Sequence, residues 1–347
     1  MALIVQKFGG TSVATPDKIR TAAEKAIRAQ QAGNQVVVVV SAMGKNTDDL
    51  VNLAGQVNPQ PPAREMDMLL ATGEQVSVAL MAMAIDALGH QAVSLTGAQI
   101  GIRTDSSHTK ARIISISTER LQSLLDAGNI VIAAGFQGID EQLDITTLGR
   151  GGSDTTAVAL AAVLGASSCE IYTDVPGVFT ADPRICPDAV KLDRISFDEM
   201  IELAGQGTKI LQIRSVECAK RYGVNVCVRS SFDDGEGTWV VPEEESMEEV
   251  LVSGVAFDRD QAKITLQGVP DRPGLAASVL GPLAGSGIVI DMIVQNISHG
   301  TATPATDLSF TVDKPDLAKA QKVIGELQGQ VKFVEVIADE DIAKVSV

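Results

Sequence analysis

Residues 36–40 are five consecutive valines, Val36-Val37-Val38-Val39-Val40, and Ser41 follows them. A run of this kind has no polar face, so it predicts a strand that is buried on both sides. Such a strand is typical of a parallel sheet covered by helices on each face. The fold is therefore expected to grow outward from this strand in both directions along the chain.

Short β-branched runs alternate with longer helical patterns through residue 241. We expect further strands at Leu3–Lys7, Gln91–Leu95, Ile130–Gly135, Glu170–Thr173 and Asn225–Arg229. We expect helices at Pro16–Gln31, Asp48–Gln56, Arg64–Leu88, Thr118–Ala127, Thr155–Leu164, Phe197–Leu203 and Gln212–Tyr222. The alternation predicts an α/β fold with one open, mainly parallel sheet and helices on both faces.

The composition changes at residues 242–249, which form an acidic stretch. Beyond it we expect strand, helix, strand, strand, helix and strand at Lys263–Val269, Gly274–Ala284, Ile288–Gln295, Leu308–Val312, Pro315–Leu327 and Val331–Ile337. This βαββαβ order predicts a ferredoxin-like unit. We therefore divide the chain into a first domain (1–241), an acidic linker and strand (242–261), a second domain (262–338) and a last segment (339–347).

Length and charge exclude several classes of protein. The 347 residues exceed what one compact core usually holds, so two domains are expected. Lys and Arg number 28 against 44 Asp and Glu, a net charge of −16, which disfavours nucleic acid and anionic membrane surfaces as partners. No apolar run approaches the ~20 residues of a membrane span, because Asp86 interrupts the best candidate, Val76–Leu88.

The four cysteines have no C-x-x-C spacing, and no basic region precedes the apolar start at Ala2–Val5. These features indicate a cytoplasmic protein with reduced thiols. Because the chain has only three histidines, neither a multi-histidine metal site nor a histidine-based catalytic triad is expected. Its chemistry must depend on other residue types.

The first predicted strand leads into Lys7-Phe8-Gly9-Gly10-Thr11-Ser12. Two glycines after a buried strand let backbone N–H groups approach an anion, and Lys7 supplies a positive charge. The lysine precedes the glycines, so this is not a Walker motif. On these residues alone the segment is either a phosphate-binding turn or an ordinary tight turn between a strand and a helix.

Two further glycine-bearing segments also follow predicted strands. Residues 146–154 (Thr-Thr-Leu-Gly-Arg-Gly-Gly-Ser-Asp) lead into an apolar helix, with Ser153 and Asp154 as capping-type residues and Arg150 suited to a carboxylate or phosphate. Residues 172–179 (Tyr-Thr-Asp-Val-Pro-Gly-Val-Phe) continue to Asp182-Pro183-Arg184. Ligands of open α/β sheets bind at the carboxyl ends of the strands, so these segments are expected to converge there.

These parts predict a nucleotide-dependent phosphoryl transferase that needs no histidine base. A carboxylate acceptor, with a pKa of about 4, is already ionised at neutral pH. Catalysis then consists of bringing two anions together and neutralising the charge on the transferring phosphoryl group. Lysines, backbone amides and Mg²⁺ carried by the nucleotide can do this.

An ordered set of segments resembles the aspartokinase family, which has the amino-acid kinase fold and C-terminal ACT domains. The segments are Lys7–Ser12, Ser41–Gly44, Thr72–Glu74, Gly135–Gly138, Gly149–Asp154, Thr173–Val175, Asp182–Arg184 and Asp271–Gly274. The resemblance implies that ATP phosphorylates the side-chain carboxylate of L-aspartate to 4-phospho-L-aspartate, at the start of lysine, threonine and methionine synthesis. It makes 1–241 the kinase domain, 262–338 an ACT domain and 339–347 the start of an incomplete second ACT module.

By matching position, the resemblance also implies residue roles. Lys7, Gly9 and Gly10 would stabilise the transferring phosphoryl group, with Asp154 orienting the cations or helping to place the metal. The substrate would be held by Ser41, Thr47, Glu74, Arg150 and Ser153, with Glu74 pairing with its ammonium group and Arg150 with a carboxylate. The ATP site would be lined by Lys7, Gly10, Thr173, Asp174, Phe179, Arg184 and Lys209. No protein side chain is expected to bind Mg²⁺ directly, and Lys110 and Arg112 receive no role.

The ACT resemblance implies feedback inhibition by lysine, threonine or both, and pairing of ACT units in a homodimer or higher oligomer. The effector would contact Asp271, Gly274, Leu275, Ala276, Gln295 and Asn296. Val250–Phe257 and the last segment would both belong to the incomplete module, and we expect them to expose unpaired strand edges. Ala14 stands where a glycine is common, which requires a negative φ there.

Two other interpretations remain open at this point. The chain could be another amino-acid kinase, acting on N-acetylglutamate or a nucleoside monophosphate, although the Thr72-Gly73-Glu74 segment and the ACT region disfavour this. It could also be an amino-acid sensor whose kinase domain no longer turns over. Retained charges at Lys7, Arg150 and Asp154 argue against the sensor, because an idle site has no reason to bury charge.

Overall fold

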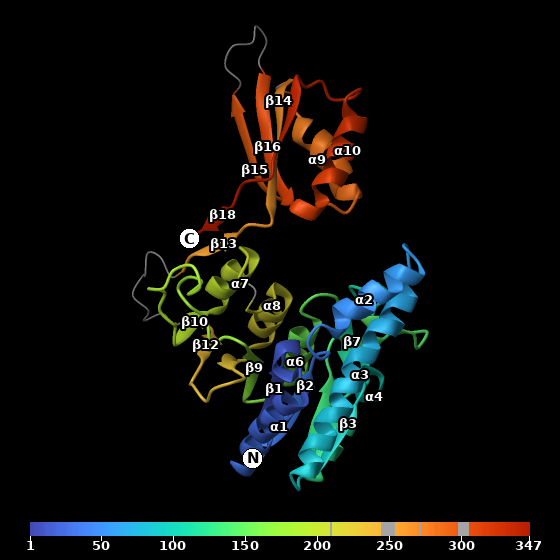
Figure 1. The fold of residues 1–347 in the computed structure, drawn as a ribbon, viewed down its shortest axis with the longest axis vertical. Helices are drawn as coiled ribbons and strands as arrows, with labels where there is room; N and C mark the ends of the chain where they lie inside the picture. The colour runs from blue at the N-terminus through green and yellow to red at the C-terminus, as the bar shows by residue number, and fades with distance from the viewer. Residues whose placement is uncertain (209, 244–253, 271, 298–304) are drawn as a thin grey trace. The chain divides into compact units, whose positions relative to one another are not determined.

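The computed structural model describes residues 1–208, 210–243, 254–270, 272–297 and 305–347 (Figure 1). The chain forms two compact units, Met1–Val255 and Ala256–Val347. Lys209, Asp271 and most of the acidic stretch, for which the sequence made predictions, lie outside the described residues. The finer division at residues 241, 261 and 338 stays a prediction.

The first unit is built on an eight-stranded sheet in the order β10-β12-β11-β9-β1-β2-β6-β3. Its strands are β1 (Leu3–Phe8), β2 (Gln35–Val40), β3 (Ala92–Leu95), β6 (Ile130–Ala134), β9 (Ser168–Thr173), β10 (Arg194–Ser196), β11 (Val226–Ser230) and β12 (Thr238–Val241). Every neighbouring pair is parallel except β11 and β12. All five valines of β2 are at most 1% exposed, which confirms the doubly buried strand.

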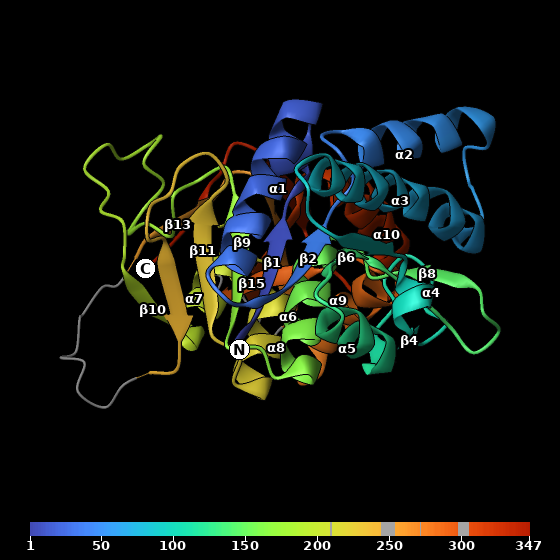
Figure 2. The same ribbon diagram turned by 90° about the horizontal axis from the view of Figure 1, so that it is seen from below.

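Helices cover both faces of this sheet, as Figure 2 shows. They are α1 (Pro16–Gln31), α2 (Asn46–Val57), α3 (Ala63–Ala87), α5 (Glu119–Asp126), α6 (Gly152–Leu164), α7 (Phe197–Gly205) and α8 (Ile213–Tyr222). Side chains of α1 and α3 pack on one face of the sheet, against Phe8 and alternate valines of β2. Helix α6 lies on the other face, against β1 and β2. Period-2 alternation therefore directs Phe8 toward α1 and the neighbouring Lys7 toward α6.

The expectation of a single sheet in this unit is wrong. A second sheet has the order β5-β4-β7-β8, formed by β4 (Ile102–Thr104), β5 (Ile113–Ile116), β7 (Gln137–Ile139) and β8 (Ile145–Thr147). The short helix α4 (Gly97–Ile100) precedes it. These strands have only three or four residues each, too few for an alternating pattern to be detected in the sequence.

The second unit has the predicted βαββαβ order. It contains β14 (Gln261–Pro270), α9 (Leu275–Gly285), β15 (Ile290–Ile297), β16 (Ala305–Asp313), α10 (Leu317–Leu327) and β17 (Glu335–Asp339), and its sheet has the order β15-β16-β14-β17. A core of buried aliphatic residues, with Phe310, joins this sheet to α9 and α10.

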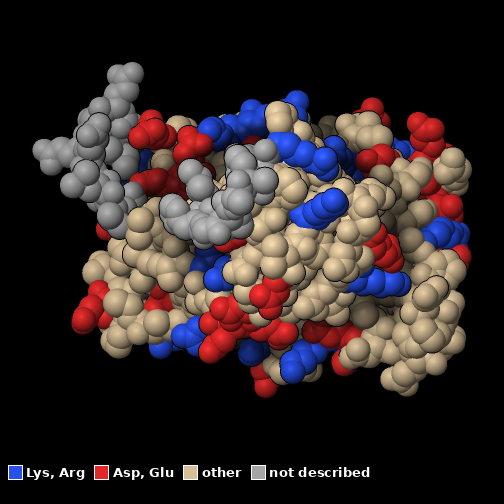
Figure 3. All heavy atoms as spheres, turned by 90° about the horizontal axis from the view of Figure 1, so that it is seen from above, with Lys and Arg blue, Asp and Glu red and all other residues tan. Residues whose placement is uncertain are grey.

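The surface view in Figure 3 shows acidic and basic side chains interspersed on one face of the molecule. The negative net charge therefore does not form a single acidic patch on that face.

The sequence analysis expected unpaired strand edges in Val250–Phe257 and in the last segment, 339–347. The structure instead pairs the strands that lie there. Strand β13 (Ala256–Asp258) pairs antiparallel with β18 (Lys344–Ser346), with Phe257 opposite Val345. Lys344 is buried and forms an ion pair with Asp291 of β15. The two segments therefore form a two-stranded sheet of their own, in which each strand pairs with one edge of the other.

Helix α3 is long and apolar enough to cross a membrane by length and composition, contrary to the expectation from the sequence. It nevertheless packs against α1 and α2 and against strands of both sheets in the first unit. It also buries Asp67 and Glu74, whose carboxylates accept hydrogen bonds from other segments. These contacts are those of a core helix.

Candidate active site

The carboxyl end of β1 carries Lys7 and the glycine turn. The Lys7 Nζ atom lies 2.6 Å from Asp154 Oδ1 of α6, and the two side chains are only 12% and 9% exposed. A Cβ atom on Gly10 would lie 2.8 Å from the Ala42 carbonyl oxygen, so only glycine fits there. Ala14 has φ −65°, so alanine is unstrained at that position. The structure thus joins the first two glycine motifs through one charged pair.

The second motif forms the start of α6. Gly149 and Gly151 have φ of +78° and +68°, a left-handed conformation that favours glycine. The expectation that Ser153 and Asp154 cap the helix is wrong, because Gly151 is the N-cap and no side chain caps this terminus. Ser153 and Asp154 lie within the first turn, where Asp154 reaches Lys7 instead. The N-terminus of α6 therefore offers amides to an external anion.

Glu74 is a buried acid among the predicted substrate residues. Its side chain is 3% exposed, and Oε1 accepts a hydrogen bond of 3.0 Å from the Ala42 amide. The other oxygen, Oε2, has no hydrogen-bond partner among the described residues. Burial raises the pKa of Glu74 from 4.5 to about 7. A buried carboxylate with one unpartnered oxygen fits a ligand that brings a positive charge.

The other predicted substrate residues come from three segments. Ser41 directly follows β2, and its amide donates to the Phe8 carbonyl oxygen at 3.1 Å. Thr47 is half-buried in the first turn of α2. Gly135, directly after β6, packs closely against Ser153. A Cβ atom on Gly135 would lie 2.7 Å from Ser153 Cβ. Arg150 is exposed and makes no hydrogen bond or ion pair with any residue that the structure describes.

The predicted nucleotide residues extend from the carboxyl end of β9. Thr173 is half-buried, and its hydroxyl donates to Asp174 Oδ1 at 3.2 Å. Phe179 is half-buried and forms an isolated bridge with Lys191. The Arg184 side chain is 86% exposed and paired with Asp182 at 2.7 Å. This group is more exposed than Glu74, and the guanidinium of Arg184 is already paired.

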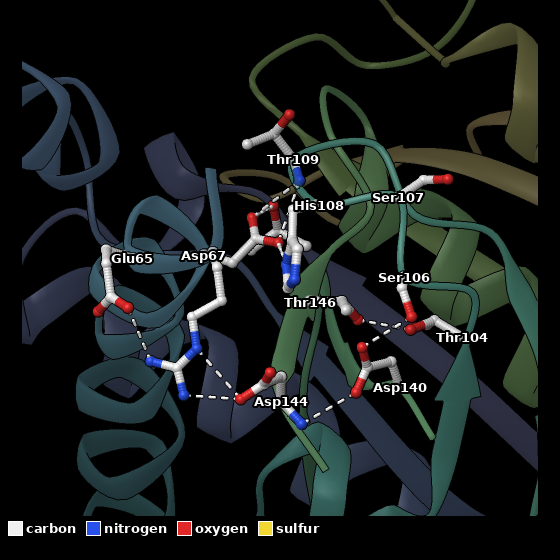
Figure 4. Close-up of polar contacts among 12 residues, drawn as sticks. Glu65, Asp67, Thr104, Ser106, Ser107, His108, Thr109, Asp140, Asp144 and Thr146 are labelled. Atoms are coloured by element: carbon white, nitrogen blue, oxygen red, sulfur yellow. Dashed lines mark hydrogen bonds and ion pairs between the residues drawn. The ribbon is translucent and has the colours of Figure 1, made fainter. Parts of the chain in front are cut away.

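The structure reveals a polar network that the sequence did not predict (Figure 4). The Asp67 carboxylate accepts hydrogen bonds from His108 Nδ1, the Thr109 amide and the Thr147 hydroxyl. Arg214 of α8 donates to the Leu148 carbonyl oxygen at 2.5 Å. The one available signal was that Asp67 lies two helical turns before Glu74, on the same side of α3.

Candidate ligand atoms of His108, Asp140 and Asp144 lie within 4.8 Å of one another. The oxygens of Asp140 accept from Ser106 and from the amides of Gln142 and Asp144. Asp144 Oδ1 is paired with Arg64 at 2.6 Å. Protein donors therefore already occupy the carboxylate oxygens of Asp140 and Asp144, and we interpret this cluster as structural rather than as a metal site.

In the second unit, the predicted effector residues lie at the start of α9 and on β15. Gly274 is the left-handed N-cap of α9, with φ +85° and no side-chain cap. Leu275 is buried in the core, so only its backbone can serve a ligand, while Ala276 is half-buried. Gln295 and Asn296 are exposed, and the Asn296 carbonyl oxygen accepts from the Thr306 hydroxyl.

Comparison with known proteins agrees with this architecture. The amino acid kinase family model matches residues 2–230, and the ACT domain model matches residues 264–329. An aspartate kinase of Stutzerimonas stutzeri (strain A1501) is 52% identical over 348 residues, which is 100% of this chain and 84% of that protein. Aspartokinase III of E. coli in complex with aspartate and ADP (R-state) matches with a TM-score of 0.80 at 28% identity. The alignment covers 99% of this chain and 86% of the E. coli chain.

The same E. coli enzyme in complex with lysine and aspartate (T-state) matches with a TM-score of 0.78 at 28% identity, over 99% of this chain and 86% of that chain. The fold and the site therefore define a phosphotransferase of the amino acid kinase family. Within it, the chain belongs to the aspartate kinases that carry an ACT domain.

Members of this family transfer a phosphoryl group from ATP to the side-chain carboxylate of L-aspartate, and that is the activity of this chain. The product, 4-phospho-L-aspartate, is the first intermediate toward lysine, threonine and methionine. Feedback by lysine or threonine is typical of the family.

Proposed function

We propose that Lys7 and the amides of Gly9 and Gly10 stabilise the phosphoryl group as it moves from ATP to aspartate. The observation that carries this proposal is the Lys7–Asp154 pair, 2.6 Å apart, beside the uncapped N-terminus of α6. An aspartate carboxylate oxygen bonds to the γ-phosphorus while the bond to the β–γ bridging oxygen breaks and ADP leaves. No proton is removed, because the carboxylate is already ionised.

Asp154 holds Lys7 in the direction of the reacting groups. Its charge also reduces the net positive charge that Lys7 presents before the anions arrive. Each aimed contact of this kind contributes on the order of 3 kcal/mol to transition-state stabilisation. The catalytic residues proposed here are Lys7, Gly9, Gly10, Arg150 and Asp154.

Aspartate binds, in this proposal, between the buried Glu74 and the exposed Arg150. The unpartnered Oε2 of Glu74 receives the ammonium group, and Arg150 pairs with the α-carboxylate. Ser41, Thr47 and Ser153 line the pocket with hydroxyl groups. Two opposite charges at fixed places would recognise an α-amino acid and align its side-chain carboxylate with ATP.

ATP binds along the carboxyl end of β9, against Thr173, Asp174, Phe179, Arg184 and Lys209. Mg²⁺ bound with ATP would neutralise phosphate charge, and in this proposal no protein side chain binds the ion directly. The carboxylates of Asp154 and Asp174 fit this role, because their oxygens could accept hydrogen bonds from water bound to such an ion. The ADP complex of the E. coli relative supports nucleotide binding on this fold.

We further propose that an amino-acid effector, lysine or threonine, binds the ACT unit near Asp271, Gly274, Leu275, Ala276, Gln295 and Asn296. The lysine complex of the E. coli relative supports this assignment. Strand β15 is an edge of its sheet, and Met292, Ile293 and Val294 on it are 41–49% exposed. Pairing with a second copy at this edge would cover them, which supports a homodimer.

Substrate analogues test the roles of Glu74 and Arg150. Release of ADP measures phosphorylation of every acceptor, and hydroxylamine traps the acyl phosphate of a carboxylate acceptor as a hydroxamate. With ATP and Mg²⁺, aspartate should be the preferred acceptor. Succinate, which lacks the ammonium group, and isoasparagine, which lacks the α-carboxylate charge, should each lose about 100-fold in kcat/KM.

Equal turnover of succinate and aspartate would refute the role of Glu74, and equal turnover of isoasparagine would refute that of Arg150. N-acetylglutamate and uridine monophosphate serve as acceptors of related kinases. If either of them reacted faster than aspartate, the proposed pocket would be wrong as a whole.

A further inference from the structure

The carboxylate of Asp67 is the most deeply buried acid beside the aspartate pocket. Asp67 is 0% exposed and lies on α3, two turns before Glu74. Its Oδ1 atom accepts from the Thr109 amide at 3.0 Å and from the Thr147 hydroxyl at 2.5 Å. Its Oδ2 atom accepts from the same amide at 3.0 Å and from His108 Nδ1 at 2.8 Å. These bonds connect α3 to two separate segments (Figure 4).

One of these segments is held in an unfavourable conformation. Thr109 has φ +67°, a left-handed conformation that is unfavourable for a β-branched residue. Its cost in free energy is of order 1–3 kcal/mol. In that conformation its amide points at Asp67, while its carbonyl oxygen faces Gly149. A Cβ atom on Gly149 would lie only 3.0 Å from this oxygen. The strained residue therefore lies close enough to Gly149, the neighbour of Arg150, to leave no room for a side chain there.

The other segment leads directly to Arg150. Thr147 ends β8, three residues before Arg150, and its carbonyl oxygen accepts from the Ala111 amide at 2.9 Å. Arg214 then joins both segments, because it donates to the Leu148 and Ala111 carbonyl oxygens at 2.5 and 3.1 Å. The backbone between Thr147 and Arg150 is thus fixed from α3, from the 105–111 loop and from α8.

We propose that Asp67 is a positioning residue for aspartate binding, which acts through Thr109 and Thr147 to place Arg150. It touches no reacting atom in this role. The inference rests on the proposed function of Arg150. The buried carboxylate suits this task because four acceptor positions let it hold an amide, a hydroxyl and an imidazole at once.

The variants Thr147→Val and Thr147→Ser provide the central test, because valine has nearly the shape of threonine but lacks the hydroxyl that bonds to Asp67. Valine should raise KM for aspartate ~10-fold or more and change KM for ATP less than twofold, since only the Arg150 side shifts. Serine retains the hydroxyl and should restore most of the affinity. A general loss of structure would raise both KM values and would not be rescued by serine.

Asp67→Asn is the direct variant. One amide oxygen cannot accept from all three donors, so the same selective rise in KM for aspartate is expected, larger than for Thr147→Val. Asp144→Asn is the matched control, because it also removes the charge of a carboxylate, but one that pairs with Arg64 rather than with the 105–111 loop. If Asp67→Asn does not fold, the Thr147 pair decides the question alone.

Arg150→Ala, alone and combined with Thr147→Val, separates this inference from the function on which it rests. If Asp67 acts through Arg150, the effect of Thr147→Val on KM for aspartate should vanish in the Arg150→Ala background. Additive effects, or unchanged KM for aspartate in Thr147→Val, would overturn the positioning role. Unchanged KM for aspartate in Arg150→Ala would instead overturn the proposed role of Arg150.

Discussion

The two halves of the proposed active site differ in how firmly the fold holds them. On the aspartate side, Glu74 and Asp67 are buried on one helix, and each is bonded to the backbone of another segment. On the nucleotide side, Asp174 and Arg184 are exposed on a loop beyond β9. A small zwitterion offers little apolar surface, so its recognition depends on fixed charges, whereas a nucleotide has a larger surface over which contacts can be shared.

Lys7→Ala should give the largest effect, because Lys7 lies between the two halves. Removal of its charge should lower kcat by ~100- to 1,000-fold, the cost of about 3–4 kcal/mol for one lost electrostatic contact. It also leaves the Asp154 carboxylate near the reacting anions without its cation. Steady-state measurement of kcat with both substrates saturating tests this.

Lys220→Ala is the matched control for this charge change, since Lys220 forms an exposed ion pair with Asp198 on the molecular surface. It should keep kcat within about twofold. If kcat for Lys7→Ala were close to that of the control, the charge of Lys7 would have no role in catalysis.

Glu74→Gln should have the next largest effect, confined to aspartate. We expect KM for aspartate to rise ~10- to 100-fold, because a neutral amide cannot pair with the ammonium group. Since burial raises the pKa of Glu74 to about 7, kcat/KM for aspartate should also fall as pH drops below about 7. The variant cannot ionise there and should lose this slope.

The same raised pKa of Glu74 affects stability in the opposite direction: kcat/KM for aspartate should rise with pH, whereas the free energy of unfolding should fall. The folded state holds the Glu74 proton more tightly than the unfolded state, so its contribution to the free energy of unfolding falls as pH rises from about 4.5 to about 7. Thermal melts should therefore favour Glu74→Gln over the parent more at pH 8 than at pH 5. An unchanged difference between these two pH values would contradict the raised pKa.

Arg184→Gln should give the smallest effect. Its side chain is 86% exposed and paired with Asp182, and exposed pairs of this kind contribute roughly 0–1 kcal/mol. We expect KM for ATP to rise less than fivefold with KM for aspartate unaffected. A rise of ~100-fold would mean that the nucleotide side is as firmly organised as the aspartate side, and the contrast between them would fail.

The sequence predicted the main fold because its strongest signals were long and regular. The valine run of β2 and the helical periodicity of α1 each extend far enough to be unambiguous, and α1 begins and ends where it was predicted. The second sheet was missed because strands such as Gln137–Ile139 are too short to show a pattern. Pairing of β13 with β18 was missed because it depends on where the 85 intervening residues, 259 to 343, bring the chain.

For the candidate site, glycine turns after strands correctly predicted which segments approach one another, as the contact of Lys7 with Asp154 shows. The Asp67 network could not be predicted, because His108 and Thr109 belong to no motif, and Thr147, although it lies in the 146–154 segment, meets Asp67 only in three dimensions. The capping prediction at Ser153 failed since Gly151 takes the left-handed N-cap position, where Gln212 leaves no room for a Cβ atom.

The position of β1 in the sheet has a consequence for the newly made chain. Strand β2 can pair with β1 early, but β9, which covers its other edge, begins 160 residues after β1 ends, at Ser168 after Phe8. At a synthesis rate of about 5–20 residues per second, that edge waits roughly 10–30 s on the ribosome for its partner. During this interval the glycine turn has neither Asp154 nor β9 beside it, so nascent chains are expected to need chaperone protection and to acquire affinity for substrates late.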